Sequence, residues 1–247
     1  MDRLIYTAMS GARQFMEQQA TVAHNLANVN TTGFKAQLDT FKAVPVGDPA
    51  KSLATQVVSE TVGSDFSKGN VQQTGRVLDI AIEGDGWLAV QNAQGNEAYS
   101  RAGNLKIAEN GLLQTASGLT VMGEHGPITV TADTSIVIDK DGVVSYAVPG
   151  GSIQTQTILD RLKLVKIDDK LLNRGADGLF YSQQAAEAVA SDPDVKVLSG
   201  FLESSNVNVV DAMVRMLNMS KQYDMQMELI KTANTNDSRS GQIMSLS

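Results

Sequence analysis

Residues 1–28, MDRLIYTAMSGARQFMEQQATVAHNLAN, carry apolar side chains at alternating spacings of four and three. This spacing averages 3.5 residues, which keeps the side chains on one face of an α-helix and is typical of coiled-coil seams. The stretch therefore predicts a long N-terminal helix with one apolar stripe. The stripe consists of Met1, Ile5, Ala8, Ala12, Phe15, Val22 and Leu26, with Gln19 as its one polar member.

A second stripe with the same spacing lies near the other end of the chain. Its main members are Val209, Met213, Met216, Tyr223, Met227 and Ile230, and Leu217 widens it. Such a stripe can reflect ordinary packing onto the protein's own core. However, a lone helix of this length is marginal in water, because the cost of ordering its backbone exceeds what one apolar stripe contributes. We therefore expect each end helix to need partner helices, from the other end of the chain and from neighbouring copies.

The centre of the chain has a different composition from its ends. All ten methionines except Met122 lie in the two end regions, whereas all five prolines and every glycine except Gly11 and Gly241 lie between them. Short runs such as WLAVQ (87–91), PITV (127–130) and VVSYA (143–147) alternate with turn signals such as Asn110-Gly111. This pattern predicts short, mainly antiparallel strands in a barrel-like or sandwich-like arrangement.

Together these patterns predict an α+β protein with a coiled-coil-like helical domain built from both ends. We assign residues 1–30 and 205–247 to the helical domain, 31–75 to a connector and 76–204 to the β domain. VNTTGF (29–34) breaks the first helix, because Thr31, Thr32 and Gly33 supply turn chemistry. Within the connector, residues 34–44 fit either a short helix or an extended arm.

Composition excludes several functional classes. A formal net charge of −7 disfavours binding to nucleic acids and to anionic membranes. The absence of cysteine rules out disulfides and thiolate chemistry. The N-terminus carries charges where a secretory signal peptide needs an apolar region, and we expect any export to proceed without a cleaved signal.

No arrangement of residues predicts catalysis or a metal site. His24 and His125 lack the further ligands or triad partners that a metal centre or a nucleophile needs. Asp139-Lys140-Asp141-Gly142 lacks the later ligands of a calcium loop, and Gly84-Asp85-Gly86 lacks the rest of a dinucleotide loop. We therefore predict a protein that is not an enzyme and has no cofactor. A carbohydrate-binding β protein and a peripheral membrane protein that uses residues 1–28 are the rival classes.

Two motifs in the chain resemble signatures of a known family. AHNLANVNTTGFKAQ (23–37) resembles the N-terminal signature of the flagellar axial proteins of the rod and hook, and LESSNVNVVDAMVRMLNMSKQYDMQM (202–227) resembles their C-terminal signature. The opening MDRLIYTAMSGA and the total length are similar to those of a proximal rod subunit, with a distal rod subunit as the alternative. One departure is Lys221, where the family often has arginine. The matching residues are Asn25, Leu26, Asn28, Thr32, Gly33, Phe34, Lys35, Leu202, Glu203, Ser205, Asn206 and Val207.

The resemblance implies a structural subunit of a hollow helical rod that crosses the periplasm, transmits torque and allows export. It implies terminal helices that line the tube, a β domain outside them, and export by the flagellar type III apparatus. The implied partners are the chain itself and other rod proteins. We expect the assembly contacts to be made by Ile5, Ala8, Ala12, Phe15, Val22, Leu26, Met213, Met216, Leu217, Tyr223, Met227 and Ile230.

Overall fold

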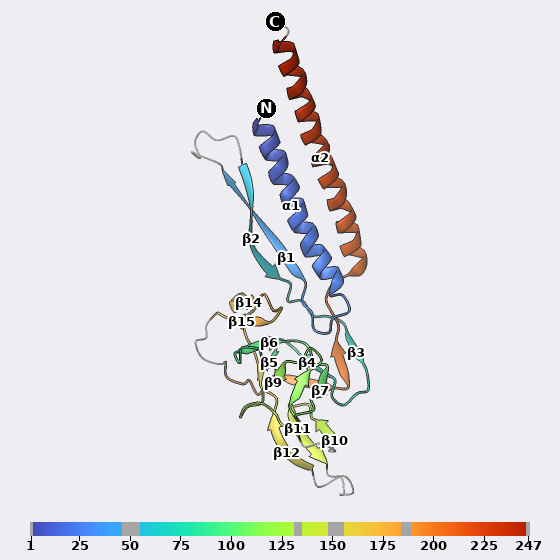
Figure 1. Ribbon diagram of the computed structural model, residues 1–247. Coiled ribbons are helices and arrows are strands. Elements are labelled where there is room, and N and C mark those ends of the chain that lie inside the picture. The colour runs from blue at the N-terminus through green and yellow to red at the C-terminus, as the bar shows by residue number, and fades with distance from the viewer. Residues whose placement is uncertain (1, 46–54, 131–134, 148–155, 184–188, 246–247) are drawn as a thin grey trace. The chain divides into compact units, whose positions relative to one another are not determined.

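The computed structural model describes residues 2–45, 55–130, 135–147, 156–183 and 189–245 (Figure 1). It contains a helix at each end of the chain and antiparallel strands between them, which confirms the predicted α+β class. Two compact units can be distinguished. The helical unit comprises residues 1–29, 36–65 and 207–247, and the β unit comprises residues 30–35 and 66–206.

In the helical unit, the helices α1 (Asp2–Ala27) and α2 (Val209–Ser245) lie side by side and run in opposite directions (Figure 1). The side chain of Gln226 in α2 lies against Gly11 of α1. A Cβ atom on Gly11 would lie 3.4 Å from Cδ of Gln226. Ala8, Ala12 and Val22 of the predicted stripe are buried. Regular coiled-coil packing between the two helices stays a prediction.

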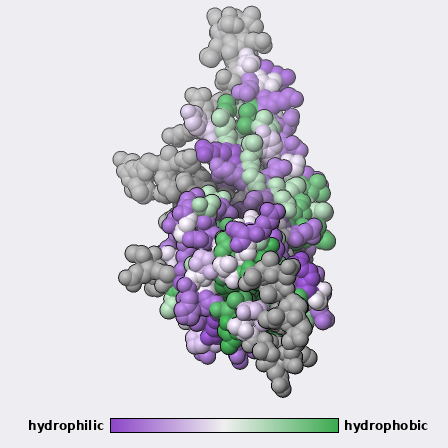
Figure 2. Space-filling model, turned by 60° about the horizontal axis from the view of Figure 1, so that its bottom comes forward, coloured by the Kyte–Doolittle hydropathy of each residue, from purple (hydrophilic) through white to green (hydrophobic). Residues whose placement is uncertain are grey.

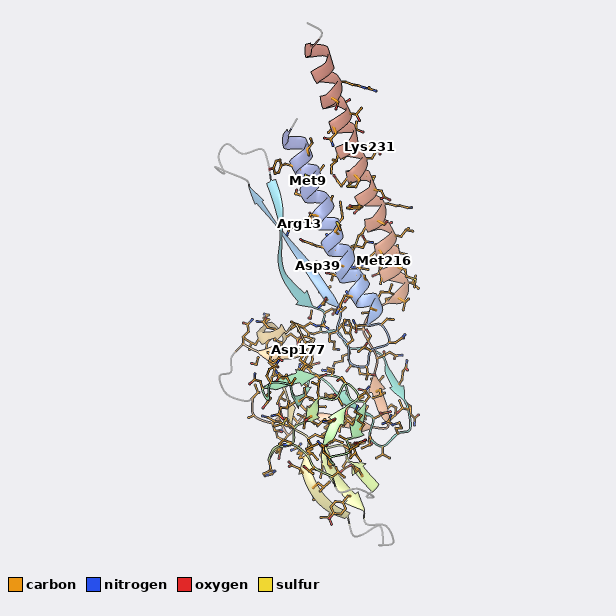
Figure 3. The ribbon with its side chains drawn as sticks, viewed as in Figure 1. Met9, Arg13, Asp39, Asp177, Met216 and Lys231 are labelled. Atoms are coloured by element: carbon orange, nitrogen blue, oxygen red, sulfur yellow. The ribbon has the colours of Figure 1, made fainter. Side chains whose placement is uncertain are left out.

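The hairpin of β1 (Gln37–Pro45) and β2 (Thr55–Ser64) contacts a different side of α1. The side chain of Asn25 donates to the carbonyl of Gln37 at 2.9 Å and accepts from the amide of Gln37 at 2.8 Å. The Thr21 hydroxyl donates to Asp39 at 2.8 Å, and Asp39 is labelled in Figure 3. This hairpin lies within residues 31–75, which the sequence predicted as a connector. A short helix and an extended arm were the alternatives for residues 34–44, and residues 37–45 are extended in the structure.

The β unit contains the remaining strands, and every strand pair within the described residues is antiparallel. Its largest sheet has the order β14-β15-β6-β5-β9-β8-β7, with β13 also paired to β5, and smaller sheets are formed by β10-β11-β12, β16-β4 and β17-β3. A short 3-10 helix, Asp169–Leu171, precedes β14. The strands are β3 (Val71–Gln73), β4 (Ile80–Glu83), β5 (Trp87–Gln91), β6 (Glu97–Ser100), β7 (Leu105–Ile107), β8 (Leu113–Thr115), β9 (Thr120–Val121), β10 (Ser135–Ile138), β11 (Val143–Ala147), β12 (Gln156–Arg161), β13 (Leu164–Val165), β14 (Leu172–Arg174), β15 (Phe180–Ser182), β16 (Lys196–Ser199) and β17 (Phe201–Glu203).

Strand β5 separates two apolar clusters, which explains why its sequence is almost wholly apolar. Leu88 and Val90 point into the larger cluster, whereas Trp87 and Ala89 point into the smaller one. Because successive side chains of a strand alternate between its two faces, a strand buried on both faces must be apolar throughout. On the face drawn in Figure 2, hydrophilic side chains interrupt the apolar surface.

The strand pattern differs from the sequence prediction at a few places. Residues 127–130 were expected to form a strand but contribute only isolated bridges, such as Thr129 to Leu112. Strands β14, β16 and β17 were not predicted, because each has only three or four residues and a weak alternation. Closure of the β unit into a barrel or sandwich stays a prediction.

The Asn25 contacts predict a local effect on the hairpin. Asn25→Leu removes both hydrogen bonds to Gln37, and each bond contributes about 1 kcal/mol. We expect the Gln37 amide to exchange with deuterium about tenfold faster or more in this variant. Asn25→Asp is the matched control, since it keeps the acceptor for the Gln37 amide, and its exchange rate should be intermediate. Unchanged exchange in Asn25→Leu would show that the amide contact does not hold the hairpin.

Candidate functional site

The first candidate site is a buried cluster of three charged side chains in the β unit, which we call the charged clamp. It consists of Lys35, Arg101 and Glu203, whose exposed fractions are 1%, 5% and 2%. Lys35 Nζ lies 2.7 Å from Glu203 Oε1, and Arg101 Nη1 lies 2.9 Å from Glu203 Oε2. One carboxylate thus binds a cation on each oxygen and joins chain segments that are 168 residues apart in the sequence.

Backbone groups add further hydrogen bonds to the clamp. The Gly69 amide donates to Glu203 Oε1 at 2.9 Å, and Lys35 Nζ also donates to the Ser67 carbonyl at 2.8 Å. The Gly33 amide donates to the Glu203 carbonyl at 2.8 Å. Gly33 has a φ of +68°, and a Cβ atom there would overlap the backbone of Arg101. Only glycine fits this position, for conformational and steric reasons alike.

A stack of aromatic rings and guanidinium groups lies beside the clamp. Arg174 covers the ring of Phe34 at 4.6 Å and donates to the Lys35 carbonyl at 2.8 Å. Phe180 lies next to Arg174 and also packs against Trp87, with 4.7 Å between the ring centroids. Arg101 in turn covers Trp87 at 5.4 Å. Cation–π contacts therefore join Phe34 to the smaller apolar cluster and to the clamp.

Electrostatics favour the ionised form of Glu203. Burial by itself would raise the pKa of this carboxyl group. The hydrogen bonds from Lys35 and the Gly69 amide, together with the charges of Arg101 and Lys35, outweigh burial and hold the pKa of Glu203 below its ordinary value of 4.5. The clamp is therefore an ion-paired cluster at neutral pH.

The motif residues identified in the sequence fall into two groups. Gly33, Phe34, Lys35 and Glu203 belong to the clamp and its surroundings. Asn206 Nδ2 donates to the carbonyl and hydroxyl of Ser67, each at 3.2 Å. In the helical unit, Asn25 holds the hairpin and Asn28 Nδ2 donates to the His24 carbonyl at 2.9 Å. Of the remaining motif residues, Ser205 is buried and Thr32, Leu202, Val207 and Leu26 are half-buried.

Sequence reasoning missed Arg101, Arg174, Ser67 and Gly69. No local pattern marks them, because their partners lie far away in the sequence. The only available signal was the charge of Lys35 and Glu203, two residues of opposite sign in segments that were expected to be adjacent to the helices.

The second candidate site is the set of faces on the two helices. The contact residues predicted on α1 lie toward the interior, with Ile5, Phe15 and Leu26 half-buried. On α2 they divide between two faces. Met216, Tyr223 and Ile230 are half-buried and share their face with the buried residues Ala212 and Ala233, whereas Met213, Leu217 and Met227 are exposed. Figure 3 labels Met9 and Arg13 on α1 and Met216 and Lys231 on α2.

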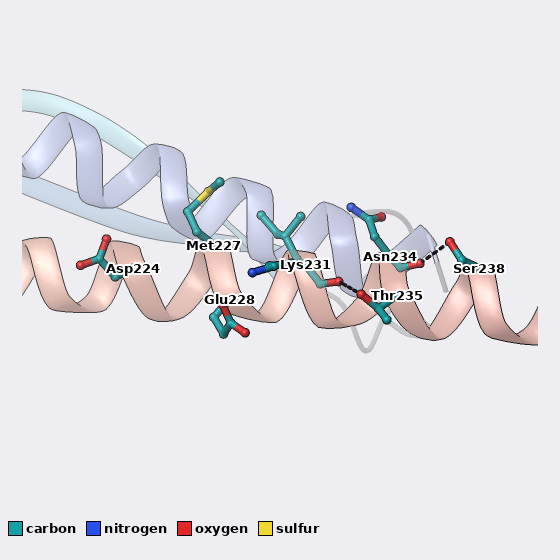
Figure 4. A pocket seen from close by; sticks show the side chains of 8 residues that line it. Asp224, Met227, Glu228, Lys231, Asn234, Thr235 and Ser238 are labelled. Carbon is teal, nitrogen blue, oxygen red and sulfur yellow. Dashed lines mark hydrogen bonds between the residues drawn. The ribbon is translucent and has the colours of Figure 1, made fainter.

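An open pocket runs along the C-terminal half of α2 (Figure 4). Its lining combines the side chains of Met227 and Ile230 with the carboxylates of Asp224 and Glu228 and the amine of Lys231. Within the described residues, no helix has an apolar stretch that could cross a membrane.

Known flagellar proteins match along the whole chain. The family described as "Flagella basal body rod protein" matches residues 5–35, "Flagellar hook protein FlgE/F/G D1 domain" matches 81–146, and "Flagellar basal body rod FlgEFG protein C-terminal" matches 198–243. The chain is 42% identical to the flagellar basal-body rod protein FlgF of Salmonella typhimurium, and 42% identical to that of Escherichia coli, over 100% of each chain. The chain belongs to the FlgF family of flagellar basal-body rod proteins.

A FlgG rod protein from Bacillus subtilis is 31% identical over 94% of this chain and 96% of its own. The identity to these FlgF relatives is thus higher than to this FlgG relative, in agreement with the expected position within the family. The FlgF relatives are named as flagellar basal-body rod proteins, which confirms the prediction of a structural rod subunit that is not an enzyme. The clamp connects the first and third matched regions, because Lys35 lies in one and Glu203 in the other.

The clamp predicts a large stability loss when its carboxylate is neutralised. Glu203→Gln leaves Lys35 and Arg101 buried without a counter-charge, and breaking a buried pair in this way costs about 3–5 kcal/mol. Denaturant unfolding can be followed by the fluorescence of Trp87, the only tryptophan. Glu83→Gln is the control, since Glu83 is exposed on β4, and it should change stability by less than about 0.5 kcal/mol. Equal stability of the two variants would contradict the role of the clamp.

The pKa of Glu203 predicts a pH dependence with a definite sign. Because the folded pKa lies below the unfolded one, the unfolded chain takes up the proton first as the pH falls. The stability that the ionised carboxylate provides is fully present above about pH 5.5 and decreases as the pH falls through about 4.5 toward the folded pKa. The stability difference between the unmodified protein and Glu203→Gln should therefore be constant near neutral pH and shrink in acid. A difference that does not change with pH would contradict this expectation.

Proposed function

We propose that this chain is a proximal rod subunit that polymerises through its terminal helices into the hollow shaft of the flagellar basal body. In this proposal residues 1–30 and 205–247 line the tube, residues 31–75 form the connector and residues 76–204 lie outside it. The shaft crosses the periplasm, transmits torque and lets exported subunits pass. The partners are further copies of the chain and other rod proteins, and the type III apparatus exports the chain without a cleaved signal.

The observation that carries this proposal is the exposure of large apolar side chains on both helices. Tyr6, Met9 and Met16 of α1 are 76%, 56% and 57% exposed. On α2, Val210 is 70% and Leu217 is 57% exposed. Exposed clusters of large apolar side chains mark surfaces that other proteins cover. Contacts in which one face binds a different face of the next copy propagate into a filament.

The charged clamp supports a mechanical role. The chain passes between the two units at residues 29–30, 35–36, 65–66 and 206–207. The last three of these positions each have one of the residues Lys35, Ser67 and Glu203, in that order, within three residues. Hydrogen bonds join Lys35 to both Ser67 and Glu203. A load carried along one connecting segment is therefore shared with the others through a rigid buried cluster. We propose that this sharing lets the rod transmit torque from its helices to its β domains.

Leu217→Glu tests the proposed assembly. Because Leu217 is exposed, the charge should leave the purified protein folded, with an unchanged circular dichroism spectrum. In cells that lack their own copy, we expect this variant to be missing from isolated basal bodies and the cells to be non-motile. Leu217→Met conserves volume and polarity and should support normal motility. Normal incorporation of Leu217→Glu would refute the proposal that this helix face assembles.

A further inference from the structure

Helix α1 has three faces, and other described residues cover two of them. One face carries Ala8, Ala12 and Val22 toward α2, and another contacts the hairpin through Thr21 and Asn25. The third face has its own spacing of three and four, and every one of its members is exposed. We call it the outer seam of α1. It consists of Tyr6, Met9, Arg13, Met16, Ala20, Ala23 and Ala27.

Helix α2 also presents an uncovered apolar row. Val210, Met213, Val214 and Leu217 are 70%, 55%, 52% and 57% exposed, and their spacing of three, one and three places them on one side of the helix. We call this row the outer ridge of α2. The same side continues toward the C-terminus with charged residues. They are Lys221, Asp224, Glu228 and Lys231.

The Gly11–Gln226 contact relates the positions of these two faces along the bundle. Because the helices are antiparallel, residues of α1 and α2 whose numbers sum to about 237 lie at the same level. Ala20, Ala23 and Ala27 are then level with Leu217, Val214 and Val210. The small side chains of the seam thus lie at the height of the large side chains of the ridge.

The same alignment also brings Arg13 and Tyr6 of the seam to the level of charged residues on α2. Arg13 is level with Asp224, and Tyr6 is level with Lys231. Asp224 and Glu228 both line the open pocket of α2 (Figure 4), where a guanidinium group can donate hydrogen bonds to both carboxylates. Tyr6 offers an aromatic face to the Lys231 ammonium group.

We infer that the outer seam of α1 binds the outer ridge of α2 on a second copy of this chain, which is displaced along the bundle by less than one heptad. This inference rests on the proposed function, because it specifies which surfaces meet during rod assembly. The alanines let the two helices approach closely, and the ridge side chains fill the space above them. Arg13 enters the pocket beside Asp224 and Glu228 and, with five donors, can also keep its exposed pair with Glu17.

Displacement by one heptad removes the match. In one direction Arg13 meets Lys231, which places two like charges together. In the other direction Arg13 meets Leu217. Ala27 is then level with a position that precedes Val209, the first residue of α2, and has no helix to pack against. Both displaced arrangements also separate Tyr6 from Lys231. Of the three arrangements, the one without a heptad displacement is therefore the one that places Arg13 beside Asp224, Tyr6 beside Lys231 and the three alanines beside the ridge.

The chain has no cysteine, so engineered pairs report contacts without background. Ala23→Cys combined with Val214→Cys places one thiol on the seam and one on the ridge at the same level. In cells without their own copy, basal bodies that contain this double variant should give a ladder of disulfide-linked multimers on mild oxidation. Ala23→Cys combined with Lys221→Cys is the matched control, displaced by one heptad, and should give no ladder. Each single variant should remain monomeric on denaturing gels.

Charge reversal tests the same alignment independently. Arg13→Asp and Asp224→Arg should each lower the amount of subunit in basal bodies by about tenfold, and the two together should restore it. A ladder from the displaced pair, a double reversal no better than the single ones, or incorporated subunits without any ladder would each overturn the alignment and leave the proposed function standing. If even the unmodified chain were absent from basal bodies, the proposed function would fail as well.

Discussion

Glu203 is a charged residue that is only 2% exposed, and the groups around it in the β unit stabilise this buried charge. A buried carboxylate is stable only when cations and hydrogen-bond donors surround it. Lys35 and Arg101 supply the cations, and the Gly69 amide supplies a donor. These groups come from three distant segments, so the segment that follows α1 and the one that precedes α2 must meet in one defined geometry. An apolar contact would tolerate sliding, whereas this ionic one does not.

The helical unit follows a different principle. Its interior is built from small or half-buried side chains such as Ala8 and Ala12, while large side chains such as Tyr6 and Val210 face outward. A helix pair arranged in this way gains little from its own interior and much from further copies. Stability and assembly are thereby linked in the helices. In the β unit they are separate, because β5 is buried on both faces within one chain.

Sequence reasoning could predict the features that depend on local order. The stripe of α1 follows from the spacing of Ala8, Ala12 and Val22, and the short strands follow from alternation and turn glycines. The hairpin partner of α1 was left open, because residues 34–44 fit a helix or an extended arm equally well, and the choice depends on the distant contact between Asn25 and Gln37. The role of Lys35 could not be predicted, because its partner lies 168 residues later. The outer seam of α1 was missed because the same spacing had already been assigned to one face.

The sequence separation in the clamp also determines when it can form. A contact between residues 35 and 203 closes a loop of 168 residues in a chain of 247. The entropy lost on closure is recovered only when the intervening strands have already drawn the ends of this loop together. Arg101 must already be in place on the sheet, since β6 ends at Ser100 directly before it. The clamp is thus among the last parts of the β unit to be completed. Both helices are then connected to a rigid cluster only after the β unit has folded, which makes completion of the β unit a condition for a subunit that can carry load.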